Sequence, residues 1–276
     1  MWLLVNGFPV LNNKAEVTEV LISFIDITER KKVEVMLQQT VEDLKASNSN
    51  LENFAFIASH DLQEPLRMVN SFLKLLEKKL EHQLNDTTRE YIHFATDGAT
   101  RMKMLIDDLL KYSKVTANKD EFLETDLDEM LDYLLRTLRE LIEKSKAVII
   151  IQSLPFIWCN KILINQLFLN LLNNALKYNE ADAPVIEVGY TEQTEEYIFY
   201  VTDNGIGINE EYFNKIFILF QRLHGKTEYS GTGIGLALCK KIVEIHNGKI
   251  WLESEEGKGT IFYFSIPKLP AVTTEY

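Results

Sequence analysis

The feature that most constrains this chain is a polar helix face within residues 170–179, followed by two glycine-rich loops. Asn170, Asn174 and Lys177 are spaced i, i+4 and i+7, so on a helix they share one face. Two amide oxygens and an ammonium group suit a polyphosphate that carries Mg²⁺, because Mg²⁺ takes oxygen ligands and keeps several waters. The pattern predicts a nucleotide site.

The two loops can complete such a site. Asp203 comes at the end of a predicted strand, where a buried carboxylate can accept a hydrogen bond from the amine of adenine. A simple Asp-Asn-Gly hairpin turn explains this first loop equally well when it is taken alone. The second loop opens a predicted helix, whose first N–H groups would bind phosphate oxygens. The glycines are Gly205 and Gly207 in the first loop, and Gly231, Gly233 and Gly235 in the second.

A candidate lid lies between the loops, over residues 217–230. Arg222, His224 and Lys226 would give it local positive charge, although an ordinary solvated loop is the alternative. A Walker-type phosphate loop is not expected around residue 225, because Phe220 stands where its first glycine would be.

A histidine with unusual neighbours stands at position 60. It falls off the apolar seam of its predicted helix, and a lone exposed imidazole is usually inert. Asp61, however, places a carboxylate beside the ring, able to orient one N–H and take its proton while the other nitrogen attacks. Pro65 lies inside the same helix and bends its axis. These neighbours favour a nucleophilic role for His60.

Two amphipathic series predict a pair of long helices joined by a turn over residues 81–88. Both alternate spacings of four and three, as an a/d seam does. Such a hairpin has too little surface to bury its seams alone, so pairing of two copies into a four-helix bundle is expected. The first series is Val33, Leu37, Thr40, Leu44, Ser47, Leu51, Phe54 and Ala58; the second is Tyr91, Ala95, Gly98, Met102, Leu105, Leu109 and Tyr112.

The flanking segments have other patterns. Residues 1–28 are β-branched and aromatic, which predicts strands over 2–5 and 17–27. After a polar linker over 117–126, helices and strands alternate, which predicts a sheet with helices on one face. The predicted helices are 127–144, 161–177 and 235–246, and the predicted strands are 148–151, 185–190, 197–202, 249–254 and 260–266.

Net charge and composition restrict the classes of binding partner and the expected location of the protein. A formal net charge of −12 argues against nucleic acid or an anionic membrane as a partner, since both attract basic surfaces. Cys159 and Cys239 form no motif and are expected to be buried, reduced thiols. No apolar run approaches the ~20 residues of a membrane span, and the opening residues lack the basic leader of a signal peptide. A cytoplasmic location is therefore expected.

In this order, over residues 30–268, these motifs resemble the catalytic core of sensor histidine kinases of two-component systems. Residues 59–67 resemble the phosphoacceptor box of the phytochrome-like branch, and residues 25–30 resemble the exit of a PAS sensor domain. The resemblance implies a dimeric helical hairpin followed by an α/β sandwich. Its implied parts are a PAS-like fragment (1–28), the dimerisation and phosphotransfer hairpin (29–116), a linker (117–125), the ATP-binding domain (126–268) and a tail (269–276).

The resemblance also implies an activity. ATP would phosphorylate His60 with help from Asp61, and the phosphoryl group would pass to an aspartate on a response regulator receiver domain. Asn174 would bind Mg²⁺. The implied nucleotide-binding residues are Asn170, Asn174, Lys177, Tyr178, Asp203, Gly205, Gly207, Arg222, Gly231, Gly233, Gly235, Leu236 and Thr260. Glu64 departs from the family, which commonly has Thr or Asn there to position water for dephosphorylating the partner.

Two other functions compete with this one. Another ATPase of the same nucleotide fold, of the gyrase, heat-shock chaperone or mismatch-repair type, would need its own transducer domain and no exposed His-Asp pair. A catalytically dead dimeric scaffold is the other alternative. The intact Asn174, Asp203 and glycine loops argue against a scaffold.

Overall fold

The computed structural model describes the whole chain except residues 14, 16, 81–84, 116–121, 224–230 and 269–276. At residues 45 and 48–60 it describes the backbone alone. The chain divides into two compact units, Met1–Phe54 and Ala55–Tyr276.

The N-terminal strands form a two-stranded antiparallel ribbon. Strand β1 (Leu3–Leu11) pairs with β2 (Val17–Asp26), so both predicted strands are present, the first extending further than predicted. Helix α1 (Thr28–Leu80) begins directly after the ribbon. Thr28 joins the two: its N–H donates to Asp26 Oδ1 (2.9 Å), and its Oγ1 accepts from the N–H of Trp2 (2.8 Å).

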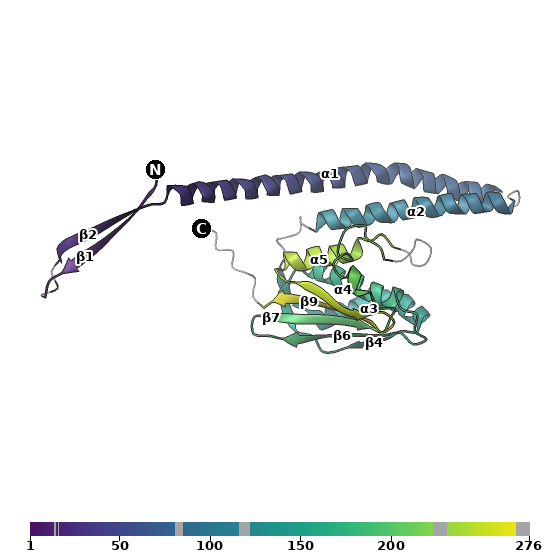
Figure 1. Cartoon of the computed structure of the whole chain (residues 1–276). Coiled ribbons are helices and arrows are strands. Elements are labelled where there is room, and N and C mark those ends of the chain that lie inside the picture. The colour runs from purple at the N-terminus through teal and green to yellow at the C-terminus, as the bar shows by residue number, and fades with distance from the viewer. Residues whose placement is uncertain (14, 16, 81–84, 116–121, 224–230, 269–276) are drawn as a thin grey trace. The chain divides into compact units, whose positions relative to one another are not determined.

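Helix α1 and helix α2 (Asp86–Lys114) form the predicted antiparallel hairpin (Figure 1). The first turn of α2 is capped by Asn85, whose Oδ1 accepts from the N–H of Thr88 at 2.8 Å, as N-cap residues do. Within the second unit the two helices are also tied by Gln63, whose amide donates to Asp107 Oδ1 at 2.7 Å.

Within the single chain, α2 buries a face that adjoins the predicted seam. Ile92 and Ala99 are buried, whereas Tyr91 and Met102 of the predicted series are exposed. Each buried position follows a residue of the predicted series by one, which corresponds to a rotation of about 100° around the helix axis. The apolar spacing alone could not separate the face that packs inside the hairpin from the face that would meet a second copy.

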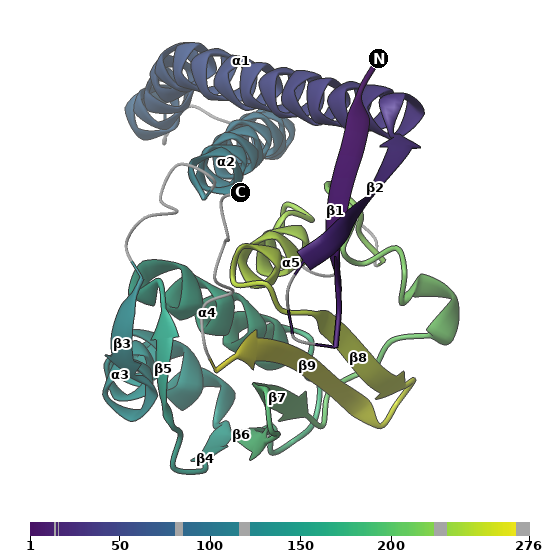
Figure 2. The ribbon, with the colours of Figure 1, turned by 90° about the vertical axis from the view of Figure 1, so that its left-hand side faces the viewer.

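The C-terminal part contains a five-stranded sheet of order β4-β6-β7-β9-β8, with its helices on one face (Figure 2). Only β4 and β6 pair in parallel. The predicted fold class is confirmed. The strands are β4 (Val148–Ile151), β6 (Val185–Glu192), β7 (Glu196–Asp203), β8 (Ile250–Glu255) and β9 (Gly259–Pro267); the helices are α3 (Leu127–Ser145), α4 (Lys161–Lys177) and α5 (Gly235–Ile245), with a 3₁₀ turn, η1 (Glu210–Tyr212).

Alternation along the strands explains the core between the sheet and the helices. Alternate residues of β7 and β9, such as Phe199 and Phe264, are fully buried on the inner face. Their rings stack with centroids 5.1 Å apart, and Phe168 of α4 packs edge-on against Phe264 at 5.4 Å. Such aromatic pairs add stabilisation beyond their buried area. Helix α4 therefore has a fixed position against the sheet.

Two short strands were not predicted. Strand β3 (Leu123–Asp126) pairs antiparallel with β5 (Phe156–Cys159) in a second, two-stranded sheet. The predicted polar linker thus ends in a strand. Each strand has only four residues, and the sequence Leu-Glu-Thr-Asp of β3 is too polar and too short to show a strand pattern.

A buried histidine joins the ends of α4 and α5. His246 Nε2 accepts from the N–H of Asn160 (3.1 Å), and its Nδ1 lies 2.7 Å from the carbonyl oxygen of Ile242. These partners assign the proton to Nδ1. Burial lowers the pKa of His246 below its ordinary value of 6.5, so the ring is neutral near pH 7. Asn160 also caps α4 through the N–H of Leu163.

Candidate nucleotide-binding site

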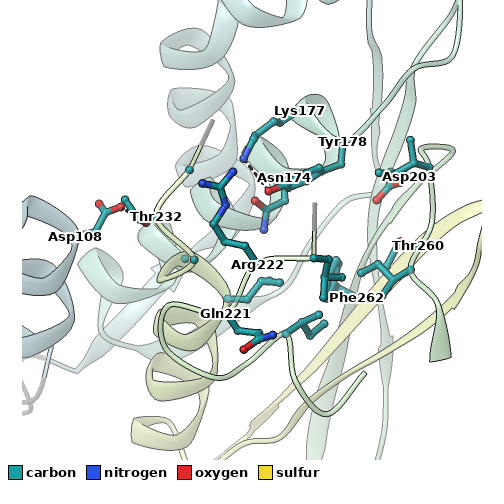
Figure 3. A pocket seen from close by; sticks show the side chains of 18 of the residues that line it. Asp108, Asn174, Lys177, Tyr178, Asp203, Gln221, Arg222, Thr232, Thr260 and Phe262 are labelled. Atoms are coloured by element: carbon teal, nitrogen blue, oxygen red, sulfur yellow. Dashed lines mark hydrogen bonds between the residues drawn. The ribbon is translucent and has the colours of Figure 1, made fainter. Parts of the chain in front are cut away.

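A cavity of about 450 Å³ lies over the inner face of the sheet, between α4, the two glycine loops and α2 (Figure 3). It brings together most of the predicted nucleotide-binding residues. Those that line it are Asn174, Lys177, Tyr178, Asp203, Gly207, Arg222, Gly231, Gly233, Gly235, Leu236 and Thr260. Asn170 and Gly205 do not line it.

Helix α4 presents its polar face to the cavity because its other face is buried in the core. Leu167, Phe168 and Leu171 are buried, while Asn174 and Lys177 reach the cavity. Lys177 Nζ donates to the Tyr178 hydroxyl at 2.8 Å. The helix therefore offers an amide and an ammonium group at one end of the cavity.

Asn170 has a different place. Its amide donates to the Gly235 carbonyl oxygen (3.3 Å), and its Oδ1 accepts from Gln166 (3.1 Å). It thus joins α4 to the start of α5, one turn before Asn174 on α4. In this structure Asn170 supports the second glycine loop.

At the other end of the cavity, Asp203 pairs with Thr260 in the β7–β9 ladder. Asp203 Oδ1 accepts from the N–H of Gly205 at 2.8 Å. Burial raises the pKa of Asp203 from 3.8 to about 6, while the hydrogen bonds from the Gly205 and Thr260 backbone lower it. The Thr260 hydroxyl lies 2.9 Å from Ser254 Oγ. The carboxylate thus accepts hydrogen bonds from the backbone of Gly205 and Thr260, and it also lines the cavity.

Replacing Asp203 by asparagine is expected to have opposite effects on folding and on binding. The pKa of Asp203 is higher in the folded protein than in the unfolded chain. The free energy of unfolding therefore falls as the pH rises from about 4 to about 6 and the folded protein has to hold an ionised, buried carboxylate. The variant should therefore be more stable than wild type at pH 8, by up to about 2 kcal/mol, and equally stable near pH 4. Asparagine has only one oxygen, so its NH₂ would face the adenine amine and weaken ATP binding about tenfold. Thermal unfolding at both pH values and ATP titration would measure this; a variant destabilised at pH 8 would contradict it.

The first glycine loop packs closely against its surroundings. A Cβ atom at Gly205 would lie 2.2 Å from the Tyr178 carbonyl oxygen, which accepts the N–H of Ile206 at 3.0 Å. Gly207 has φ +71°, and a Cβ there would lie 2.1 Å from the Glu255 carbonyl oxygen. Glycine is required at these positions for close approach and, at Gly207, for its backbone conformation.

The second glycine loop is held from both sides. Its Gly233, at φ +74°, accepts the N–H of Phe220 at 3.0 Å. Its Thr232 donates from Oγ1 to Asp108 Oδ2 of α2 at 2.7 Å. Helix α5 then begins at Gly235, and no side chain among the described residues caps it. Its first N–H groups therefore remain available to an anion.

Several lining residues were not predicted. The apolar ones are Ile206, Ile208, Ile216, Leu223 and Phe262, and apolar residues carry no sequence signal that separates a pocket wall from a core. Gln221 and Thr232 adjoin predicted positions. Helix α2 adds Met104, Asp107, Asp108 and Lys111 to the lining. The other lining residues follow more than sixty positions later in the chain, so no spacing in the sequence could predict that α2 lies beside them.

The predicted phosphoacceptor lies on another element. His60 and Asp61 are on α1, and Asp61 is exposed and does not line the cavity. The side chain of His60 is outside what the structure describes. In the candidate lid, Arg222 lines the cavity, whereas His224 and Lys226 are outside the described residues.

Chemically, the cavity suits an adenine nucleotide. Amide and ammonium groups, a glycine loop and an uncapped helix start can hold phosphates, and a buried carboxylate lies at the opposite end among apolar side chains. The described residues contain no cluster of three or more His, Cys, Asp or Glu side chains arranged for a metal ion. An amide oxygen such as that of Asn174 fits Mg²⁺ that arrives with a polyphosphate and keeps its waters.

Comparisons with known proteins agree with this geometry. Residues 50–118 match the model of the His Kinase A (phospho-acceptor) domain, and residues 159–270 match that of the histidine kinase-, DNA gyrase B- and HSP90-like ATPase. The described part of the chain holds no helix long and apolar enough to cross a membrane.

Similar proteins include phytochromes. The chain is 45% identical to the phytochrome-like protein Cph1 of Synechocystis and 46% identical to cyanobacterial phytochrome A of Nostoc, over 84% of this chain in both cases. It spans 31% and 30% of their lengths, about a third of each relative.

Among solved structures, full-length ShkA in complex with AMPPNP superposes with a TM-score of 0.60 at 23% identity, over 79% of this chain and 46% of that one. ThkA in complex with the response regulator protein TrrA superposes with a TM-score of 0.56 at 22% identity, over 97% of this chain and 75% of that one. At these identities the likeness concerns the fold. The two domain matches, together with the phytochrome relatives, show that this chain belongs to the sensor histidine kinases.

Proposed function

We propose that this chain is an ATP-dependent protein-histidine kinase that phosphorylates His60 and transfers the phosphoryl group to an aspartate of a response regulator. The observation that carries the proposal is the cavity, which gathers Asn174, Lys177, Asp203 and the second glycine loop. The same chain carries a His-Asp pair on a proline-containing helix. A nucleotide site and a nucleophile on separate elements suit phosphoryl transfer between them.

In this proposal, one end of the cavity binds the adenine ring and the other binds the phosphates. Asp203, supported by Thr260, binds the adenine amine, while the glycine loop and the start of α5 bind the phosphates. Asn174 would hold Mg²⁺ through its amide oxygen, and the bound ion would supply charge neutralisation for the phosphates. Lys177 and Arg222 supply further positive charge, which a chain of net charge −12 must concentrate locally.

The chemical step occurs at His60. One ring nitrogen attacks the γ-phosphorus, the bond from that phosphorus to the β–γ bridging oxygen breaks, and ADP leaves. Asp61 accepts the proton of the other nitrogen, so the phosphorylated ring stays neutral apart from its phosphate. A carboxylate of the receiver domain then takes the phosphoryl group and frees His60. The solved complex of ThkA with the response regulator TrrA supports a partner of this kind.

The hairpin is proposed to pair with a second copy. Apolar side chains of both helices are exposed in the single chain, more than a monomer normally leaves in contact with water. Pairing two hairpins into a four-helix bundle would cover them. The residues concerned are Leu62, Met68, Val69, Phe72, Leu75, Leu76, Tyr91, Phe94 and Met102.

Incubation with γ-labelled ATP and Mg²⁺ tests the function. A kinase of this type would acquire label that acid removes and alkali preserves, because a phosphorus–nitrogen bond is acid-labile. ATP turnover without label on the protein would support an ATPase of the gyrase or chaperone type. The absence of both label and ATP turnover would support a scaffold.

Glu64 leads to a prediction about the reverse reaction. It stands one turn after His60, where a carboxylate would repel the aspartyl phosphate of a partner instead of positioning a water molecule for it. Phosphatase activity toward the phosphorylated regulator is therefore expected to be weak or absent. Loss of label from a purified, phosphorylated receiver would be followed with and without this protein. Rapid loss that requires the protein would overturn the prediction.

A further inference from the structure

An ion pair lies beside the proposed phosphoacceptor on α1. Arg67 holds both carboxylate oxygens of Glu64: Nε is 3.0 Å from Oε2, and Nη2 is 2.7 Å from Oε1. This bidentate geometry fixes the orientation of the carboxylate and also pairs its negative charge with the guanidinium.

The helix places both residues on the face of His60. Glu64 follows His60 by four positions and Arg67 follows it by seven, so the three lie on one stripe of α1. Glu64 thus lies about one helical turn further along α1 than His60. Left alone, it would add negative charge where ATP, and later the receiver aspartate, must approach.

We propose, on the basis of the proposed function, that Arg67 is a positioning residue for phosphoryl transfer at His60. It holds the Glu64 carboxylate in one orientation and offsets part of its charge. The repulsion that Glu64 exerts on the phosphates of ATP near His60 is thereby reduced, although not removed.

The pair has little structural purpose. The side chains of Arg67 and Glu64 are 66% and 61% exposed, and exposed pairs at this spacing contribute little to stability. A comparable pair, Arg139 with Glu143, lies on α3 with side chains 77% and 63% exposed and an N–O distance of 2.7 Å. It provides a matched control away from His60, on a helix that does not line the cavity.

The test measures the rate of autophosphorylation in single turnovers, at low salt and at ~0.5 M salt. Arg67→Gln is expected to slow the reaction about fivefold at low salt, with ATP affinity unchanged, because repulsion between surface charges a turn apart is modest. Salt should reduce the difference to less than about twofold, since it screens exposed charges. In the double variant Glu64→Gln/Arg67→Gln, the rate should return to within about twofold of wild type.

Two controls show whether the effect belongs to the charge beside His60. Arg139→Gln should react like wild type, and circular dichroism should show equal helicity in all variants. A double variant as slow as Arg67→Gln, or a loss that salt does not reduce, would overturn the role of Arg67. Equal rates for Arg67→Gln and wild type would overturn it as well. Absence of acid-labile label on the wild-type chain would instead overturn the proposed function, and this proposal with it.

Discussion

Replacing His60 by glutamine is expected to remove all acid-labile phosphate from the protein while ATP binding remains. Glutamine can keep a polar group on the helix but has no ring nitrogen able to form the phosphorus–nitrogen bond. The cavity is lined by other elements, so nucleotide affinity should stay within about twofold of wild type. Labelling with γ-labelled ATP, together with titration of an ATP analogue, measures both effects.

His93 is the matched control for this variant. It is also a histidine on a helix of the hairpin, and it is exposed, but Phe94 rather than a carboxylate follows it. His93→Gln should therefore take up label at the wild-type rate. Persistent label in His60→Gln, or its loss in His93→Gln, would show that another residue accepts the phosphoryl group.

The second large effect is expected from Gly207→Ala. Its φ of +71° costs an alanine about 1 kcal/mol. In addition, the new Cβ would lie 2.1 Å from the Glu255 carbonyl oxygen and 2.9 Å from Glu256 Cα, both backbone atoms that cannot move independently. A total destabilisation of about 3 kcal/mol or more is expected, with ATP affinity lowered at least tenfold, because the first glycine loop must shift.

Gly257→Ala separates backbone strain from collision. Gly257 has nearly the same conformation, at φ +80°, but a Cβ there would meet no atom within 4 Å. This variant should lose only about 1 kcal/mol and keep its ATP affinity. Chemical denaturation and ATP titration of both variants provide the comparison. Equal losses in the two would mean that the close approach to Glu255 does not govern the loop.

Most of the polar and glycine residues that the sequence singled out line the cavity, because their sequence signal depends on local spacing. The spacing of Asn174 and Lys177 on one helix face, and the need for glycine at Gly207 and Gly233, follow from backbone geometry alone. Asn170 shows the limit of such reasoning. It shares the helix face with Asn174, yet tertiary packing turns its amide toward Gly235.

Features that depend on distant packing could not be predicted. The contribution of Asp108 to the cavity requires α2 to lie against the second glycine loop, which no spacing in the chain encodes. The buried face of α2, at Ile92 and Ala99, depends on which apolar stripe meets α1. Strand β3 owes its pairing to β5, some thirty residues further on, more than to its own composition.

The buried imidazole of His246 makes the stability of this part of the fold dependent on pH in the acid range. As the pH falls below the ring's ordinary value of 6.5, the unfolded chain takes up a proton that the folded chain resists, and stability declines. A protonated Nε2 would point its hydrogen at the N–H of Asn160, so the contact that joins the ends of α4 and α5, two helices that border the cavity, would be lost. Acidification would thus weaken the support of the cavity at His246, a residue that does not itself line the cavity.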